Sequence, residues 1–330
     1  YRVALGRVAD DGGIKLRLTV DPIGRPLTAD ADLSIWVDRG APRYEGSLTL
    51  ARAVGRASEG GLIESWRVTS RVKGDGAAAV LEQIEFQYGP DERAIKLRGD
   101  AKVTVGSQPQ VNGVLSSPQL DLDRMLALPE ETRRRPLVAI KTLVESFSGA
   151  QKLPFPVKLG LGVDTVTLAG ATLQRVSGDL KTDGETWDIE SLDLRAPGIT
   201  QVRLSGRFGA TPKGVAFEGP AKVDSGDPRA LLAWLTDRVD PQAVAAGSLR
   251  LSGDVVLGSE TIAVDRLKAE VDRMTVLGRF AYSWNGNDRP ARLDAALTAP
   301  EIDLDRVQAL AKSILGMTLV THQTGPAGKL

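Results

Sequence analysis

Apolar residues recur at every second position along much of this chain. The clearest runs are 14–20 and 33–37 in the first half, and 192–195, 202–205 and 249–252 in the second. Successive side chains of a β-strand face opposite ways, so this alternation predicts sheets with one apolar and one polar face. Strands buried on both faces would instead read as continuous Val, Ile and Leu runs.

Glycine and Asx residues separate these runs, at 10–13, 59–61, 182–184 and 285–288. Such residues supply the positive-φ positions that tight hairpins need. The short spacing between runs favours a meander of antiparallel hairpins, with no room for crossover helices. The predicted fold class is mainly β: elongated, repetitive antiparallel sheets with a few short α-helices between repeats.

Three stretches leave the two-residue period and predict helices. Residues 121–150 read as two helices, with Pro136 in the first turn of the second, where a missing N–H costs nothing. Asp227-Pro228 opens a helix near 227–246, because a capping residue followed by proline is a typical helix start. A terminal helix is expected near 305–316.

A long internal repeat divides the chain. Leu115–Arg124 matches Leu297–Arg306 position by position, as identical or conservatively replaced residues. A shorter motif (apolar residue, any residue, Gly-Asp) recurs at 72–75, 97–100, 176–179 and 251–254, and 204–208 resembles 276–280. Repeats of this kind indicate stacked units that share one long core. We expect a first β-repeat unit at 1–150 that ends in a helical segment, and a second at 151–330 that contains the two later helices.

Composition removes several classes of function. The 42 basic and 42 acidic side chains cancel, so a nucleic-acid partner is not expected. There is no cysteine, and the single histidine, His322, lies in a terminal segment that reads as a solvated tail. No nucleophile–base set or phosphate loop stands out. We expect no catalytic residues, no metal and no cofactor, and therefore no enzyme.

Two Asp-x-Asp pairs, Asp121/Asp123 and Asp303/Asp305, have the spacing of some divalent-cation ligands. Each pair stands where a predicted strand gives way to a helix. Carboxylates at that position cap free N–H groups and interact favourably with the helix dipole. We therefore interpret them as helix caps.

These residues resemble the AsmA family. The resemblance is carried by the strand–Pro–x–Leu–Asp–Leu–Asp–Arg segment that leads into a helix, by strands ending in Gly-Arg-Phe, and by 217–235; it is strongest over 157–315. It implies a bent β-groove whose concave apolar face holds acyl chains. It also implies a periplasmic protein of the cell envelope, acting in phospholipid transport between inner and outer membranes or in outer-membrane biogenesis. The chain would be an internal fragment, with an inner-membrane anchor outside it.

Strand phase nominates the groove-lining side chains: Leu16, Leu18, Val20, Leu33, Ile35, Val37, Leu192, Leu194, Val202, Leu204, Leu249 and Leu251. Aromatic residues make up only 5% of the chain, and an aliphatic lining suits phospholipid or another acyl-chain lipid. The five tryptophans are scattered and read mostly as core or rim packing, with Trp36 on the polar phase of its strand. The cluster Arg133, Arg134 and Arg135 is a candidate for anionic headgroups, although Glu130 and Glu131 beside it also fit a solvated loop.

Two other functions stay open from the sequence. One is a structural or adhesive repeat scaffold whose sheets close into dry sandwiches without a ligand. The other is a carbohydrate-acting β-solenoid enzyme, which the even distribution of acidic and aromatic residues disfavours.

Overall fold

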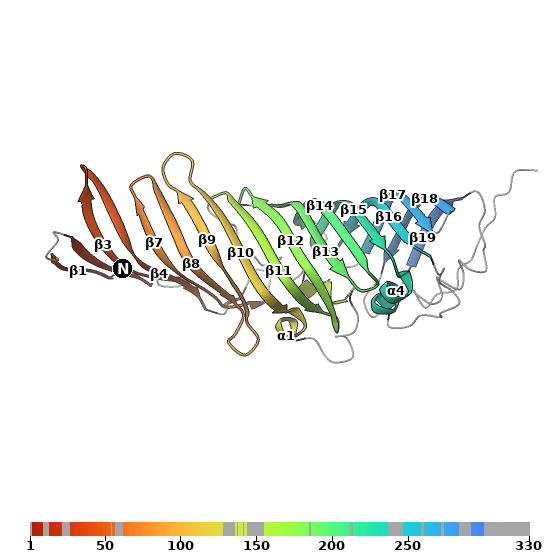
Figure 1. Cartoon of the computed structure of the whole chain (residues 1–330), viewed down its shortest axis with the longest axis horizontal. Helices are drawn as coiled ribbons and strands as arrows, with labels where there is room; N and C mark the ends of the chain where they lie inside the picture. The colour runs from red at the N-terminus through yellow and green to blue at the C-terminus, as the bar shows by residue number, and fades with distance from the viewer. Residues whose placement is uncertain are drawn as a thin grey trace, which may run out of the picture.

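A computed structural model describes residues 2–8, 13–21, 27–53, 55–56, 62–127, 136, 138–140, 142–143, 155–184, 186–211, 214–236, 247–258, 261–271, 274–283 and 292–299. Within these ranges, seventeen strands form one sheet, and β5 (Gly55–Arg56) and β6 (Leu62–Ile63) form a separate small ladder. The sheet runs along the long axis of the molecule, with its strands crossing that axis obliquely (Figure 1). The predicted mainly-β, elongated fold class is confirmed.

The first half of the sheet contains β1 (Arg2–Val8), β2 (Ile14–Val20), β3 (Leu27–Asp38), β4 (Ala41–Arg52), β7 (Trp66–Asp75), β8 (Ala78–Tyr88), β9 (Ile95–Thr104) and β10 (Gln110–Asp121). The second half contains β11 (Val157–Leu168), β12 (Ala171–Thr182), β13 (Trp187–Ala196), β14 (Thr200–Thr211), β15 (Gly214–Ser225), β16 (Leu249–Leu257), β17 (Thr261–Val271), β18 (Met274–Ser283) and β19 (Arg292–Thr298). Two helices are described in full, α1 (Leu122–Leu126) and α4 (Pro228–Thr236).

Neighbours in the sheet follow chain order, and all pairs but one are antiparallel. The exception is β10–β11, which pair in parallel from Val111/Val157 to Asp121/Thr167. A parallel pair needs a long crossover, and 122–156 supplies it. The expectation of no crossover overlooked that the helical segment after β10 could serve as one. The unit boundary proposed at residue 150 lies in this connection.

The two long rims of the sheet differ, and we name them by what they carry. The hairpin rim carries turns such as 39–40 and 76–77, which join β3 to β4 and β7 to β8. The helix rim carries the longer connections, including α1 and α4, which lie along the lower side of the sheet in Figure 1. Residues 136, 138–140 and 142–143 are helical, as predicted around Pro136. The predicted helix near 305–316 and residues 237–246 of the predicted helix near 227–246 lie outside the described residues.

The densest packing is at the helix rim in the middle of the molecule. Ala139 and Leu231, from the helical segments, join one core cluster with sheet residues that include Val166, Leu173 and Ala196. Side chains that the helices cover are almost fully buried: Val163 is 3% exposed and Leu168 is 4% exposed. The helices therefore cover one edge of the apolar face.

The molecule is open rather than compact. The two outermost strands, β1 and β19, each pair on one side only within the described residues, so the sheet does not close on itself there.

Candidate functional site

The candidate site is the apolar face of the sheet, which the strand register makes continuous. Residues directly opposite one another on adjacent strands lie on the same face. Starting from Ile14, such pairs run from β2 to β19 just inside the hairpin rim. This row, which we call the rim row, consists of Ile14, Ile35, Tyr44, Gly74, Ala79, Val103, Val111, Val157, Thr182, Trp187, Phe208, Phe217, Leu257, Ile262, Tyr282 and Leu293.

The nominated groove residues share this face but form two separate groups. On β2 and β3, Leu16 lies opposite Leu33. On β13 and β14, Leu192 lies opposite Leu204. The register also pairs Leu18 with Ala31, Val20 with Ala29, Ile35 with Ile14 and Tyr44, Leu194 with Val202, Val202 with Val223, Val223 with Leu251, and Leu249 with Ser225. Strands β4 to β12 separate the groups, so they are two stretches of one long surface.

Exposure distinguishes this face from an ordinary protein core. The nominated residues are half-buried, except Val37, which is 73% exposed near the hairpin tip where it faces Pro42. Leucines in a closed sandwich would be buried by the facing sheet. The apolar face is therefore only partly covered.

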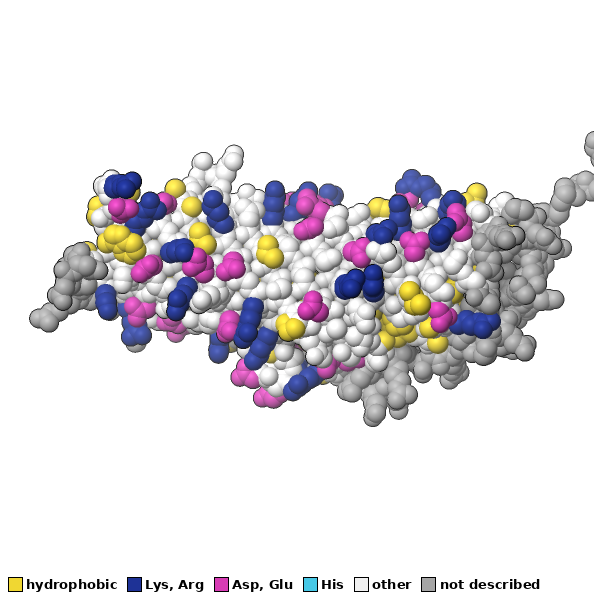
Figure 2. Space-filling model, in the orientation of Figure 1, with side chains coloured by type: hydrophobic (Ala, Val, Ile, Leu, Met, Phe, Trp, Pro, Cys, Tyr) yellow, Lys and Arg dark blue, Asp and Glu magenta, His cyan; other side chains and the backbone are white. Residues whose placement is uncertain are grey.

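The opposite face is polar and electrically balanced. Its charges pair across strands, as in Arg203–Asp193 at 3.1 Å and Lys181–Glu190 at 3.0 Å. Lys181 has a raised pKa because Glu190 accepts its hydrogen bond and carries negative charge. Figure 2 shows Lys and Arg interspersed with Asp and Glu on the visible face, with only small, separate hydrophobic patches. This is a solvated surface, whose exposed pairs contribute little stability.

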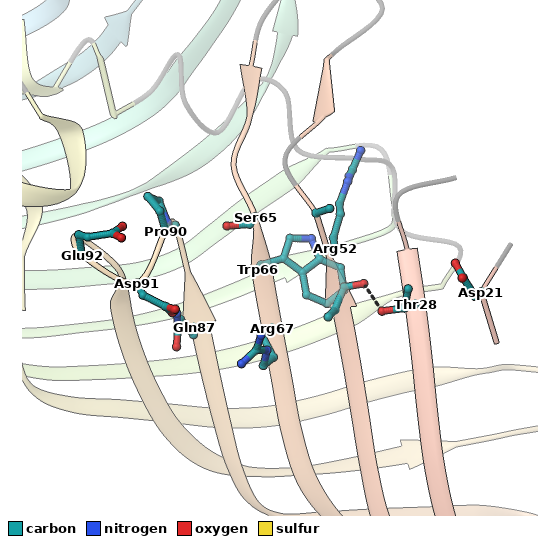
Figure 3. Close-up of a pocket in the computed structure, with 13 residues that line it drawn as sticks. Asp21, Thr28, Arg52, Ser65, Trp66, Arg67, Gln87, Pro90, Asp91 and Glu92 are labelled. Carbon is teal, nitrogen blue, oxygen red and sulfur yellow. Dashed lines mark hydrogen bonds between the residues drawn. The ribbon is translucent and has the colours of Figure 1, made fainter. Parts of the chain in front are cut away.

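A cavity of about 600 Å³ opens at the helix rim of the first half. Trp66 and Arg52, cross-strand partners on β7 and β4, lie side by side in it (Figure 3). Nearby, the Thr28 hydroxyl donates to the Ala51 carbonyl at 3.4 Å. Asp91 and Glu92 line the cavity from the turn after β8. The lining mixes aromatic, acidic and basic groups and does not repeat the aliphatic character of the sheet face.

An ion pair beside this cavity attaches α1 to the sheet. Arg93 pairs with Glu64 at 2.6 Å and donates to the Met125 carbonyl of α1 at 2.7 Å. Burial, together with the Glu64 charge, raises the pKa of the nearby Tyr88 hydroxyl. These groups are bonded to one another, which suits a structural role.

The first Asp-x-Asp pair is explained by backbone hydrogen bonds. Asp121 caps α1, as predicted, by accepting from the Arg124 N–H at 2.8 Å. Asp123 is 5% exposed and reaches across to the β11–β12 turn, where it accepts from the N–H groups of Ala169 and Gly170 at 2.6 and 2.8 Å. The second contact was not foreseen from the sequence. Asp303 and Asp305 lie outside the described residues.

Within the described ranges, no three His, Cys, Asp or Glu side chains gather as a metal site requires. Among the same residues, no helix is both long and apolar enough to cross a membrane. The candidate headgroup cluster Arg133, Arg134 and Arg135 lies outside the described residues, as does His322.

The aromatic part of the rim row was missed by sequence reasoning. Trp187, Phe208, Phe217 and Tyr282 come from four strands but lie in one row. They are scattered along the chain, and only the register brings them together. The one signal in the sequence was their phase, since Trp187 shares the apolar parity of Ile189 on β13.

Comparison with known proteins gives little further information. No family model matches the chain, and no solved structure matches it significantly. A stretch of 27 residues is 78% identical to the succinate–CoA ligase [ADP-forming] subunit beta of Sulfurovum sp. (strain NBC37-1), and 74% identical to that of Sulfurimonas denitrificans. The match covers 8% of this chain and 7% of each ligase subunit, so it carries no argument about the sheet.

Proposed function

We propose that the apolar face of the sheet binds acyl chains, and that the chain is a lipid-handling segment of an AsmA-like envelope protein. In this proposal it acts in the periplasm, with an inner-membrane anchor in another segment. Phospholipid or another acyl-chain lipid moves between the inner and outer membranes along the face, or is held there during outer-membrane biogenesis. No catalytic step is part of the proposal.

The observation that carries this proposal is a continuous apolar face from β2 to β18 on which side chains such as Leu16, Leu192 and Leu204 are only half-buried. Other side chains on the same face, such as Val72 and Phe217, are buried. Soluble monomers rarely leave a contiguous apolar surface larger than a few hundred Å² uncovered. Each methylene that moves from water onto such a surface contributes about 0.8 kcal/mol, so a single acyl chain would be a substantial ligand. The dry-sandwich scaffold is less well supported, because the described residues form one large sheet rather than two facing ones.

The test is lipid retention by the purified protein. The double variant Leu192→Gln/Leu204→Gln places two polar side chains opposite each other on the apolar face of β13 and β14. The control Asp193→Asn/Arg203→Gln changes the adjacent cross-strand pair on the polar face of the same strands. Protein purified from bacteria under native conditions would be extracted with organic solvent, and the lipids quantified by mass spectrometry.

We expect about stoichiometric phospholipid with the wild-type protein and the control, and at least a several-fold loss with the Leu192/Leu204 variant. Circular dichroism would check that both variants keep their strand content. A lipid-free, stable wild-type monomer would contradict the proposal and favour the scaffold function.

A further inference from the structure

The two rims of the apolar face offer different surroundings to a bound amphiphile. At the helix rim, helical segments pack over the strand ends, and Leu120, Leu168 and Ala196 are at most 8% exposed. At the hairpin rim, Trp187, Phe208 and Tyr282 remain half-buried. The described turns there contain no helix that could cover them. Phe217 is the exception, at 7% exposed. Among the described residues, this face is therefore less covered at the hairpin rim than at the helix rim.

The second half of the rim row has the composition of a hydrocarbon–water boundary. From β13 to β18 it reads Trp187, Phe208, Phe217, Leu257, Ile262 and Tyr282, each directly opposite the next. Trp and Tyr combine an apolar ring with a polar N–H or O–H group, so they favour sites with one apolar and one wet side. Only 5% of the residues in the chain are aromatic. Their concentration at one rim therefore distinguishes the rim row from the aliphatic rows nearer the middle of the strands.

The charges next to this part of the row compensate one another. Arg207, beside Phe208 on β14, pairs with Asp188, beside Trp187 on β13, at 3.0 Å. Lys181 pairs with Glu190 nearby. Both pairs lie on the polar face of the sheet, so they balance charge on that face and leave the apolar face free of charged side chains at this point.

The strands are long enough for a bound acyl chain to lie entirely over the less covered part of the face. The ten residues of β13, from Trp187 to Ala196, span roughly 33 Å at about 3.3 Å per residue. An acyl chain of one leaflet spans about half of a hydrocarbon core of about 30 Å. A chain that starts at Trp187 would end near the middle of the strand, over the half-buried Leu192 and Leu204, before it reaches the covered helix rim.

We infer that bound lipids lie along the strands, with headgroups in water at the hairpin rim between β13 and β18 and tail ends toward the helix rim. This rests on the proposed function and adds an orientation and an entry side to it. Lipids enter sideways, past the aromatic row, and the ligand class is a diacyl amphiphile.

Single-tryptophan proteins test the orientation. Each keeps one of Trp187, Trp234 or Trp36, with the other tryptophans changed to Phe. Trp187 marks the hairpin rim, Trp234 lies on α4 at the helix rim, and Trp36 lies on the polar face of β3 opposite Arg43. Each protein would be loaded with phosphatidylcholine brominated either near the headgroup or near the chain end, because bromine quenches tryptophan fluorescence at short range.

We expect headgroup-proximal bromine to quench Trp187 at least twofold more than Trp234, and chain-end bromine to remove or reverse that difference. Trp36 should not be quenched. Equal quenching of Trp187 and Trp234 by both probes, or a reversed order with the proximal probe, would overturn the orientation while leaving lipid binding intact. Absence of retained brominated lipid by mass spectrometry would instead overturn the proposed function itself.

Discussion

At the scale of single residues, the buried carboxylate of Asp123 links the two halves of the sheet. It follows β10, yet it binds two backbone N–H groups of the turn that joins β11 to β12. Ala169, in that turn, has a left-handed φ of 52°, which points its N–H and that of Gly170 at one acceptor. The Leu-Asp-Leu-Asp-Arg motif therefore has two roles. It caps a helix, and it forms a contact with a turn 46 residues away in the sequence.

We expect Asp123→Asn to lower the free energy of unfolding by about 1.5–3 kcal/mol, because a charged acceptor of two buried N–H groups is lost. Asp121→Asn is the matched control: Asp121 is exposed, and Asn caps a helix about as well as Asp. Urea denaturation followed by circular dichroism measures both. Equal effects of the two substitutions would argue against a special role for Asp123.

At the scale of elements, glycines of the recurring motifs stand where adjacent strands come closest. A Cβ at Gly99 on β9 would collide with the Val114 carbonyl of β10. At Gly278 on β18, φ is 155° and a Cβ would collide with the Ala296 carbonyl of β19. Bulges lie next to these positions, for example at Gln83, whose N–H donates to Asp100 of the Gly99-Asp100 pair at 3.0 Å. The Gly-Asp motif thus accommodates a bulge on the adjacent strand, and bulges bend strands.

We expect Gly99→Ala to destabilise the protein by about 1–3 kcal/mol, since the new methyl group forces the backbone apart. The control is Gly162→Ala on β11, where a Cβ would meet no atom within 4 Å. That change should stay within about 0.5 kcal/mol. Thermal unfolding midpoints would compare the two, and similar midpoints would show that close approach is not the reason for glycine at position 99.

Sequence reasoning predicted the strands more successfully than their partners. The alternation at 14–20 matches β2 residue for residue, and Pro136 lies in a helix as its position suggested. The alternation of apolar and polar residues is a property of a single strand, so it shows only which side chains of that strand share a face. It does not report which residue stands opposite Trp187, because that depends on turn lengths and on bulges such as Arg175, with φ of 51°. The aromatic row and the parallel β10–β11 pair were missed for this reason.

At the scale of the whole molecule, the elongated shape arises because strands are added side by side to one sheet that does not close on itself. A compact chain of 330 residues has a radius of gyration of about 20 Å. We expect small-angle X-ray scattering to give a clearly larger value and a distance distribution with the long tail of an elongated particle. A value near 20 Å would mean that the sheet closes on itself in solution.

The single parallel pair has a consequence for folding. Most antiparallel neighbours in this sheet are close in sequence, so they can form early through short loop closures, whereas β10 and β11 are separated by 35 intervening residues. Stacked units of this kind derive their cooperativity from contacts with adjacent units. We expect the pairing of β10 with β11 to be the slowest step in forming the continuous surface, because it needs the longest loop closure between adjacent strands of the sheet.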